Sequence, residues 1–337
     1  MSNSKIQHTK GSSPQAPLRS VRRSRTTRLW RWLTIPIICL FLFYAAVGYL
    51  VSSFMIGENP RWRGMNRGPQ DFGLKGETVS FSSQDGIALK AWWLPAEGNP
   101  RATIIIAHGI DHTRQVMLPR ASFLVRGGYN VLALDLRGHG ESAAQYVSPG
   151  YLEAHDILGA VQYIRERGEH APIALLGVSL GAAASMIAAA DSREISAVIA
   201  DGVFPSGKDV FDNICSYYMH DSHSKLWLRG VFMVARSPGL VGAIVLVYYA
   251  RTGIYLGSDF VSVLLYATRI RIPVMLISGD RDWIVPTAQT RRVLAALPTE
   301  RKSLVVIPNA VHDTTYSAAP ALYQSAVLGF LDSNLPK

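Results

Sequence analysis

The sequence predicts a three-layer α/β fold built on a mostly parallel sheet of eight strands. The first observation is a series of short, continuous apolar runs, such as TIIIA at 103–107 and VLALDL at 131–136, which are typical of strands buried on both faces. The second is that segments of helical pattern separate most of these runs. The third is composition, because 337 residues with 48% hydrophobic and 17% charged side chains can bury a large core in one or two domains.

The predicted strands and helices alternate after an initial pair of strands. We expect strands at residues 78–82, 87–94, 102–108, 129–136, 173–178, 197–203, 274–278 and 304–308. We expect helices at residues 115–126, 151–167, 180–190, 288–297 and 318–331. The first two strands are joined by the turn signal Gln84-Asp85-Gly86 without a helix, which predicts that the sheet begins with an antiparallel pair.

A long segment without a clear strand interrupts the alternation between Val203 and Ile272. We interpret residues 204–270 as a helical insertion at the strand ends, and its runs at 226–235 and 240–250 are strongly apolar. Three interpretations of this apolar character stay open: a roof that binds an acyl chain, a surface that enters a membrane, or helices that only pack on the core. The run at 240–250 is too short for a second membrane span but long enough for an interfacial helix.

The N-terminal part of the chain differs in composition from the rest. Residues 1–32 hold eight basic side chains and no acidic one, which predicts a basic disordered tail. Residues 33–56 are mostly apolar and contain no charged side chain, which predicts a transmembrane signal anchor. Residues 57–76 are rich in Gly, Pro and Arg and are interpreted as a linker, so the folded domain is expected at 77–335.

Two other interpretations of the apolar segment are a cleaved signal peptide and a buried core helix. A signal peptide has an apolar region of about 7–15 residues followed by a small-x-small site, whereas Ala46-Val47-Gly48 lies inside the apolar segment. A core helix is disfavoured because the segment has no polar face. Six basic residues shortly precede the span and four follow it, which predicts a single-pass protein with a cytoplasmic N-terminus and an extracytoplasmic folded domain.

The net charge of +10 resides in the N-terminal part, because residues 76–337 hold 22 basic and 22 acidic side chains. A surface that binds nucleic acid needs clustered basic residues on the folded part, so we expect no nucleic-acid partner. Two cysteines, Cys39 and Cys215, exclude a disulfide framework and a four-thiolate zinc site.

The strongest chemical signal is the motif Gly177-Val178-Ser179-Leu180-Gly181. It follows an apolar, strand-like run and precedes an Ala-rich helical segment, which is the strand–turn–helix context of a nucleophile elbow. A structural Gly-rich turn is the alternative, but the flanking elements favour Ser179 as a nucleophile.

A serine nucleophile needs a base that is held by a third group, and after such an elbow the acid precedes the histidine in the chain. His312 is the only histidine after the insertion and lies just past the last predicted strand. The acid is expected after the preceding strand, where Asp280 and Asp282 are both candidates that spacing alone does not separate. His139 precedes Ser179 in the chain and is interpreted as a residue that structures its loop.

Backbone N–H groups are expected to complete this site. The motif AHGI at 107–110 ends the third strand, and the N–H of Ile110 can join that of Leu180 as an oxyanion hole. No organic cofactor is needed for such chemistry, and no metal is expected. The pairs Asp111-His112 and Asp221/His223 lack the spacing of metal ligands.

Together these motifs resemble those of the α/β-hydrolase superfamily, and the resemblance covers roughly residues 76–335. The most similar group comprises single-domain serine hydrolases described as serine aminopeptidase-like or esterase/lipase-like. The motifs that carry the resemblance are AHGI (107–110), DLRGHGES (135–142), LGVSLGAA (176–183), SGDRDWIVP (278–286) and NAVH (309–312). The resemblance implies an α/β-hydrolase fold in which Asp282 is the triad acid and residues 204–270 form a cap over the active site.

The activity that the resemblance implies is that of a serine hydrolase, in which Ser179, His312 and Asp282 cleave an ester or thioester through an acyl-enzyme. The expected partners are a small, apolar acyl substrate and a membrane, which residues 33–56 would enter. Two alternatives remain: an aminopeptidase-like hydrolase of short peptides or amides, and a catalytically silent membrane binding protein on the same fold. The sequence does not predict the oligomeric state.

Overall fold

The computed structural model describes residues 25–55, 66–144, 146–221, 225–257 and 260–335. The chain divides into two compact units, residues 1–43 and 44–337. Most of the predicted tail (1–32) and about half of the predicted linker (57–76) lie outside the described residues.

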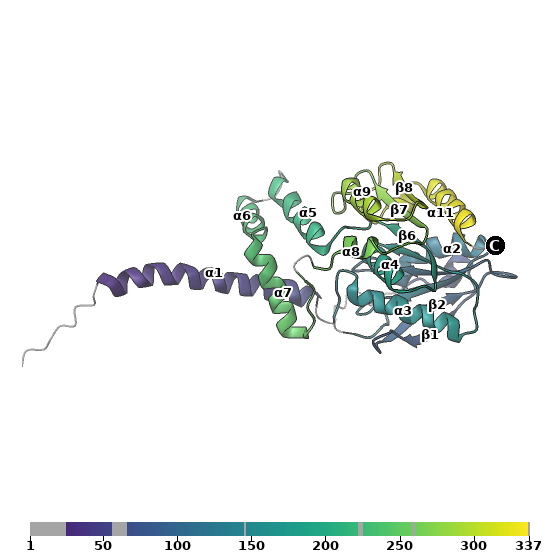
Figure 1. Cartoon of the computed structure of the whole chain (residues 1–337), viewed down its shortest axis with the longest axis horizontal. Coiled ribbons are helices and arrows are strands. Elements are labelled where there is room, and N and C mark those ends of the chain that lie inside the picture. The colour runs from purple at the N-terminus through teal and green to yellow at the C-terminus, as the bar shows by residue number, and fades with distance from the viewer. Residues whose placement is uncertain (1–24, 56–65, 145, 222–224, 258–259, 336–337) are drawn as a thin grey trace, which may run out of the picture. The chain divides into compact units, whose positions relative to one another are not determined.

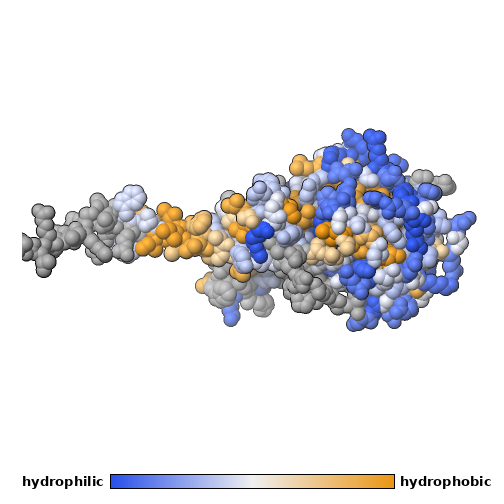
Figure 2. All heavy atoms as spheres, turned by 90° about the horizontal axis from the view of Figure 1, so that it is seen from below, coloured by the Kyte–Doolittle hydropathy of each residue, from blue (hydrophilic) through white to orange (hydrophobic). Residues whose placement is uncertain are grey.

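Helix α1 (Arg25–Met55) contains the apolar segment of the N-terminal part. Within it, residues 32–53 have a mean hydropathy of 2.2, and at roughly 1.5 Å per residue they can cross a bilayer core of about 30 Å. Figure 2 shows hydrophobic residues gathered along this helix. Its length and composition are those of a membrane anchor or a signal sequence. The predicted span at 33–56 falls within α1 except for residue 56, which lies outside the described residues.

A sheet of eight strands forms the centre of the larger unit, in the order β1-β2-β4-β3-β5-β6-β7-β8 (Figure 1). The strands are β1 (Glu77–Ser82), β2 (Ala88–Leu94), β3 (Thr103–Ala107), β4 (Asn130–Asp135), β5 (Ile173–Val178), β6 (Ile195–Asp201), β7 (Val274–Gly279) and β8 (Lys302–Ile307). Strand β2 runs antiparallel to both β1 and β4, and the other neighbouring strands are parallel. The expected antiparallel start and the mostly parallel sheet are therefore confirmed.

Helices cover both faces of this sheet. One apolar core receives residues from α3 (Tyr151–Glu166), α4 (Leu180–Asp191) and α9 (Thr287–Ala296), and the other from α2 (Leu118–Arg126) and α11 (Pro320–Asn334). In β3, Ile105 belongs to the first core, whereas Ile104 and Ile106 belong to the second. Because both faces of the strand are buried, it has no solvent-facing position, and its sequence is a continuous apolar run.

Shorter elements complete the connections. They are the 3₁₀ turns η2 (Pro69–Phe72) and η3 (Arg114–Met117), and the one-turn helix α10 (Thr315–Ala318) before α11. The predicted helix at 115–126 therefore starts as a 3₁₀ turn, and the one predicted at 318–331 is divided by the break between α10 and α11. Pro320, at the first position of α11, fits this break because proline is favoured where a helix begins.

The described residues between β6 and β7 include four helices, and we call residues 204–270 the cap. They are α5 (Gly207–His220), α6 (Leu226–Ala235), α7 (Pro238–Thr252) and α8 (Val263–Ala267). An antiparallel bridge between Ser206 and Ser262 joins the two ends of the cap. Tyr248 on α7 is fully buried, and its hydroxyl donates to the carbonyl of Val147 at 3.2 Å. The cap is thus closed at its base, and α7 is tied to the loop between β4 and α3.

Buried ion pairs hold the loop 135–142, which follows β4. Arg137 is only 3% exposed, and its guanidinium donates to Asp156 on α3 at 2.7 Å and to Asp85 in the β1–β2 turn at 2.6 Å. In the same loop, Asp135 accepts hydrogen bonds from the backbone and the side chain of Arg114. A buried charge that loses its partner is left uncompensated in a nonpolar environment, so each of these groups depends on the other.

We predict that Asp156→Ala lowers the free energy of unfolding by up to about 3–5 kcal/mol, because Arg137 loses its fully buried partner and keeps only the partly exposed Asp85. Urea unfolding in detergent, followed by circular dichroism, measures the change. The control is Glu194→Ala, which removes the exposed partner of Arg165 and should cost less than about 1 kcal/mol. Equal losses for the two variants would contradict a special role for the buried pair.

Candidate active site

Ser179 lies on the tight turn between β5 and α4. Its backbone has φ 51° and ψ −110°, a conformation that residues other than glycine rarely adopt. The turn is held by the Ser179 N–H, which donates to the carbonyl of Asp201 at 2.8 Å, and by the Gly181 N–H, which donates to the carbonyl of His108 at 3.1 Å. The strained backbone is thus bonded to β6 and to the end of β3, the strands on either side of β5.

The two glycines of the motif are required by this close packing. A Cβ on Gly177 would lie 2.1 Å from the carbonyl oxygen of Gly181, and a Cβ on Gly181 would lie 2.4 Å from that of Ala107. Neither backbone oxygen can move without breaking the turn. Only glycine therefore fits on either side of the serine, which gives the Gly-x-Ser-x-Gly spacing its physical reason.

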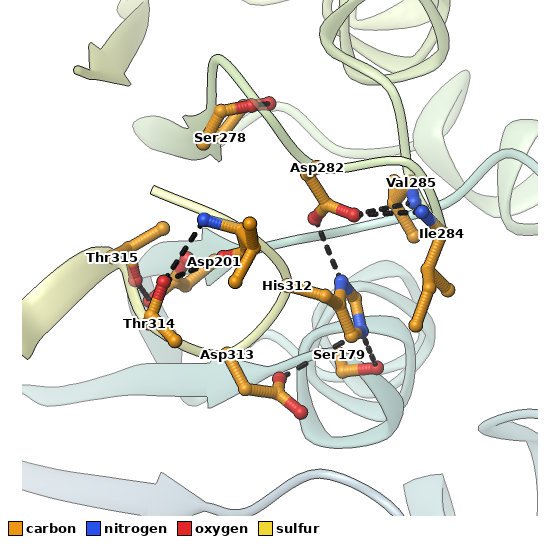
Figure 3. A network of polar contacts seen from close by, with 12 residues as sticks. Ser179, Asp201, Ser278, Asp282, Ile284, Val285, His312, Asp313, Thr314 and Thr315 are labelled. Atoms are coloured by element: carbon orange, nitrogen blue, oxygen red, sulfur yellow. Dashed lines mark hydrogen bonds and ion pairs between the residues drawn. The ribbon is translucent and has the colours of Figure 1, made fainter. Parts of the chain in front are cut away.

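His312 and Asp282 extend a line of hydrogen bonds from Ser179 (Figure 3). The distance from His312 Nε2 to Ser179 Oγ is 2.9 Å, and that from His312 Nδ1 to Asp282 Oδ2 is 2.7 Å. Because an ionised carboxylate only accepts, Nδ1 carries the proton and Nε2 is free to accept from the serine hydroxyl. The structure thus brings together the three residues that the sequence singled out, from the ends of β5, β7 and β8.

The loop after β7 decides between the two candidate acids. Asp282 is buried, and its second oxygen, Oδ1, accepts from the backbone N–H groups of Ile284 at 3.0 Å and Val285 at 2.8 Å. Asp280 is exposed and one residue past β7, where its backbone N–H donates to Ile307. The carboxylate next to His312 is therefore that of Asp282.

The groups of the predicted oxyanion hole lie at two chain segments beside Ser179. Leu180 begins α4, so its N–H is among those that have no acceptor within the helix. The other segment follows β3, where a Cβ on Gly109 would lie 3.4 Å from Ser179 Cβ. Ile110 comes next in this segment and is partly exposed. Two backbone segments thus approach the serine from β3 and from α4.

Asp313 is a second acid near the serine that sequence reasoning missed. One of its oxygens lies 3.7 Å from His312 Nε2, and the other lies 3.6 Å from His112 Nε2. Its side chain is 31% exposed, and its backbone has φ 63°. Figure 3 shows the carboxylate on the side of His312 opposite to Asp282. In the sequence, Asp313 is recognisable only as an acid that directly follows the candidate base His312. Its proximity to Nε2 depends on how the loop folds.

Asp201 is a second residue that sequence reasoning missed. It ends β6, is buried, and its Oδ2 accepts from Thr315 Oγ1 at 2.6 Å, Tyr323 OH at 3.1 Å and Arg120 Nη2 at 3.2 Å. These donors belong to α10, α11 and α2, so one carboxylate ties three helices to the end of β6, and α10 follows the loop that carries His312. Its signal was the single charge at the end of the apolar run ISAVIAD.

Electrostatics favour the charged form of His312. Burial alone would lower its pKa, but the hydrogen bond to Asp282 and the negative charges of Asp313, Asp282 and Asp201 outweigh burial and raise the pKa above its ordinary value. His312 must be neutral to accept a proton from Ser179. The raised pKa therefore moves the acidic limit of base action to higher pH.

Two other histidines near the strand ends stay neutral. Burial lowers the pKa of His108 to about 4 and that of His139 to about 3. Their rings pack edge to face, with centroids 5.0 Å apart, and His139 Nδ1 bonds with the carbonyl of Arg137 at 2.8 Å. These contacts fit the loop-structuring role that the sequence suggested for His139.

The described residues contain no cluster of three or more His, Cys, Asp or Glu side chains arranged to hold a metal ion. His223, one of the residues weighed as a ligand, lies outside them. Cys39 and Cys215 are both free thiols.

A protein-family model described as "Serine aminopeptidase, S33" matches residues 98–209 and 249–317 of this chain. The two ranges make up more than half of the chain and include Ser179, Asp282 and His312. The match leaves out α1, the first two strands, most of α5 to α7 and α11, so most of the cap is not described by the family model.

The chain is similar to protein YfhR of Escherichia coli (strain K12), with 27% identity over 77% of this chain and 81% of YfhR. It is similar to YfhR of Salmonella typhi over 92% of this chain and 97% of the relative, with 26% identity. Among solved structures it is similar to the esterase Pf2001 of Pyrococcus furiosus, with a TM-score of 0.65 and 25% identity. That similarity covers 82% of this chain and 99% of the esterase.

We predict that Asp313→Asn lowers the pKa of His312, because it removes a negative charge 3.7 Å from Nε2. The measurement is an NMR titration of the His312 ring, assigned by its loss in a His312→Asn variant. Glu300→Gln, an exposed acid past α9, serves as the control and should leave the titration unchanged. An unchanged or higher pKa in Asp313→Asn would contradict this electrostatic picture.

Proposed function

The chain belongs to the serine aminopeptidase family of α/β hydrolases, and from this premise we propose that it is a membrane-anchored serine hydrolase that cleaves an ester or thioester. The observation that carries the proposal is the line of hydrogen bonds from Asp282 through His312 to Ser179, at 2.7 and 2.9 Å. In this proposal Ser179 is the nucleophile, His312 is the general base and Asp282 orients the imidazole.

The proposed reaction has two halves. In the first, His312 Nε2 takes the proton of Ser179 Oγ as this oxygen attacks the acyl carbon, and the same proton then passes to the leaving oxygen or sulfur. The acyl group stays on Ser179 as an ester. In the second half, His312 deprotonates a water that attacks this ester, and Ser179 recovers its proton when the acid departs. Asp282 stabilises the imidazolium that forms in each half.

Backbone N–H groups of Ile110 and Leu180 are the proposed oxyanion hole. The negative charge of the tetrahedral intermediate needs donors that are already in position, and each is worth about 2.7–4 kcal/mol in the transition state. The free N–H at the start of α4 and the close approach of Gly109 to Ser179 both support this assignment.

An ester or thioester with an apolar acyl group is the proposed substrate class. The support is the 25% identity to an esterase and the aromatic character of the cap beside the acid loop. Tyr217 on α5 stacks on Trp283 with ring centroids 4.0 Å apart, next to Asp282. Both rings are partly exposed and can contact an apolar group.

Asp313 favours a second candidate, the hydrolysis of short peptides or amides. An enzyme that binds the amino group of a peptide is expected to place an acid close to the serine, and Asp313 keeps an exposed carboxylate beside His312. His112, at 3.6 Å, competes for this carboxylate when it is protonated. The two candidates therefore differ in whether the substrate carries a positive charge near its carbonyl group.

Anchoring through residues 33–56 is part of the proposal, with the N-terminus in the cytoplasm and the folded domain outside. The length and hydropathy of α1 support a span, and the excess of basic residues before it supports this orientation.

We predict that wild-type protein in membranes reacts with a fluorophosphonate probe and that Ser179→Ala does not, while the variant keeps its fold. Turnover of an activated ester should fall at least about a thousandfold, because the acyl-enzyme can no longer form. Thermal unfolding of both proteins is the control for folding. A well-folded wild type that is not labelled would favour the silent binding protein.

The same assay tests which aspartate acts with His312. Asp282→Asn should lower turnover far more than Asp280→Asn, because only Asp282 bonds to His312. The reverse ranking would move the proposed acid to Asp280.

We predict that p-nitrophenyl esters of apolar acids are hydrolysed with a higher kcat/KM than amino-acid arylamides. At a pH above the range in which His312 titrates, Asp313→Asn should change kcat/KM little for the uncharged esters. It should lower kcat/KM for any arylamide that carries a free amino group, because Asp313 is the acid beside His312. Faster hydrolysis of the arylamides would establish the peptidase candidate instead.

A further inference from the structure

The outer faces of two cap helices are apolar. On α7 the exposed positions include Gly242, Leu246, Tyr249 and Ala250, which recur every three to four residues and so form one stripe without a charge. Leu246 keeps 66% of its exposure. On α6, Leu226 is 83% exposed and Met233 lies two turns further on the same face. These side chains are apolar, yet they face away from the protein and no described residue covers them.

Two polar side chains at the ends of α7, those of Ser237 and Arg251, contact the last turns of α1 instead. At the start of α7, Ser237 Oγ and Tyr44 OH are 2.7 Å apart. At its end, Arg251 donates to the hydroxyls of Ser52 and Ser53, each at 2.7 Å, and its guanidinium lies over the ring of Tyr49. A water-exposed helix pair would turn these groups outward and its leucines inward, whereas helices in lipid pair their polar groups with each other.

Small residues let the two helices approach closely. A Cβ on Gly48 of α1 would lie 3.1 Å from the carbonyl oxygen of Ala243 on α7, and one on Gly239 would lie 2.8 Å from the ring of Tyr44. Tyr44, Val47 and Val51 pack on a buried cluster that includes Leu240 and Ile244 of α7. Close contact at small residues is the usual packing of helices in a bilayer.

The residues of α1 that contact α7 lie within the predicted membrane span. Tyr44 and Ser52 both lie in the apolar segment 32–53, and eight residues of helix separate them by roughly 12 Å. Residues that α7 contacts therefore run from near the middle of the predicted span to its end. At that end Arg251 meets the serines, where a cation can reach the headgroups.

We propose that α6 and α7 lie within one leaflet of the bilayer, beside the last turns of α1, and that lipid acyl chains cover their outer face. The position of the cap rests on the proposed membrane anchoring, and only its consequence for the substrate rests on the proposed hydrolysis. At 10 and 15 residues, these helices are too short to span the bilayer and long enough to lie in its interface.

The embedded cap also reaches the active site. Phe211 and Cys215 of α5 belong to the same cluster as Leu240 and Ile244 of α7. From α5, Asn213 donates to the carbonyl of Ile284 at 2.8 Å, in the loop that holds Asp282. A substrate dissolved in the leaflet would therefore meet the cap before it meets water, which deepens the substrate class to acyl compounds that partition into membranes.

The test measures lipid contact in the full-length protein, reconstituted in vesicles of phosphatidylcholine and phosphatidylglycerol. Three single-cysteine proteins carry the fluorophore NBD in a Cys215→Ala background: native Cys39 in α1, and Leu246→Cys and Leu322→Cys with Cys39→Ala. Leu322, on α11, is 45% exposed and is the matched control. We expect doxyl-labelled lipid to quench NBD at positions 39 and 246 at least about twofold more than at 322. Aqueous iodide should quench mainly at 322.

Each other outcome has one meaning. NBD at 246 that iodide reaches as readily as at 322, while position 39 is lipid-quenched, overturns the embedded cap and leaves the anchor intact. Protection of 246 from both quenchers indicates cover by protein, such as a second copy, and also overturns it. Aqueous quenching at position 39 contradicts the anchoring itself. Thermal unfolding confirms that each labelled protein is folded, and no outcome depends on turnover.

Discussion

Three segments of backbone meet where the chain passes from β5 into α4, and the site is arranged around this contact. The carbonyl oxygens of Ala107 and Gly181 lie where any side chain on Gly181 or Gly177 would have to be. This packing turns the chain sharply enough to lift Ser179 out of the sheet, at the cost of a φ of 51°. Hydrogen bonds to Asp201 and His108 hold the turn from the strands on both sides. The position of the proposed nucleophile is thus set by the sheet rather than by a loop.

The remaining groups reach the serine because parallel strands end at the same edge of the sheet. The loop after β7 supplies Asp282 and that after β8 supplies His312, and the two loops are joined by the Arg281 N–H, which donates to the carbonyl of Ala310. Asp201 stabilises this arrangement, since its carboxylate accepts hydrogen bonds from side chains of α2, α10 and α11. Burial of a charge is unfavourable unless it is paired. A full set of donors around Asp201 therefore fixes the helices that support the His312 loop.

Much of this arrangement could be predicted because its signals are local in sequence. Strands buried on both faces are apolar throughout, and Ser179 stands in a motif whose glycines have no substitute. The positions of His312 and Asp282 followed from chain order and from resemblance. Asp201 and Asp313 were missed because their meaning depends on which helices and loops fold against them, and no spacing encodes that. The same holds for the polar contacts between α1 and α7, which join residues about 200 positions apart.

Holding a serine at a positive φ sets the proposed chemistry of Ser179 against the stability of the turn. A glycine at position 179 would adopt φ 51° without strain, and relief of such strain is worth about 1–3 kcal/mol. The most stable version of this turn is thus one that lacks the hydroxyl. Selection for a more robust fold alone would replace Ser179, so its presence in a strained turn is what the proposed role of its hydroxyl would explain.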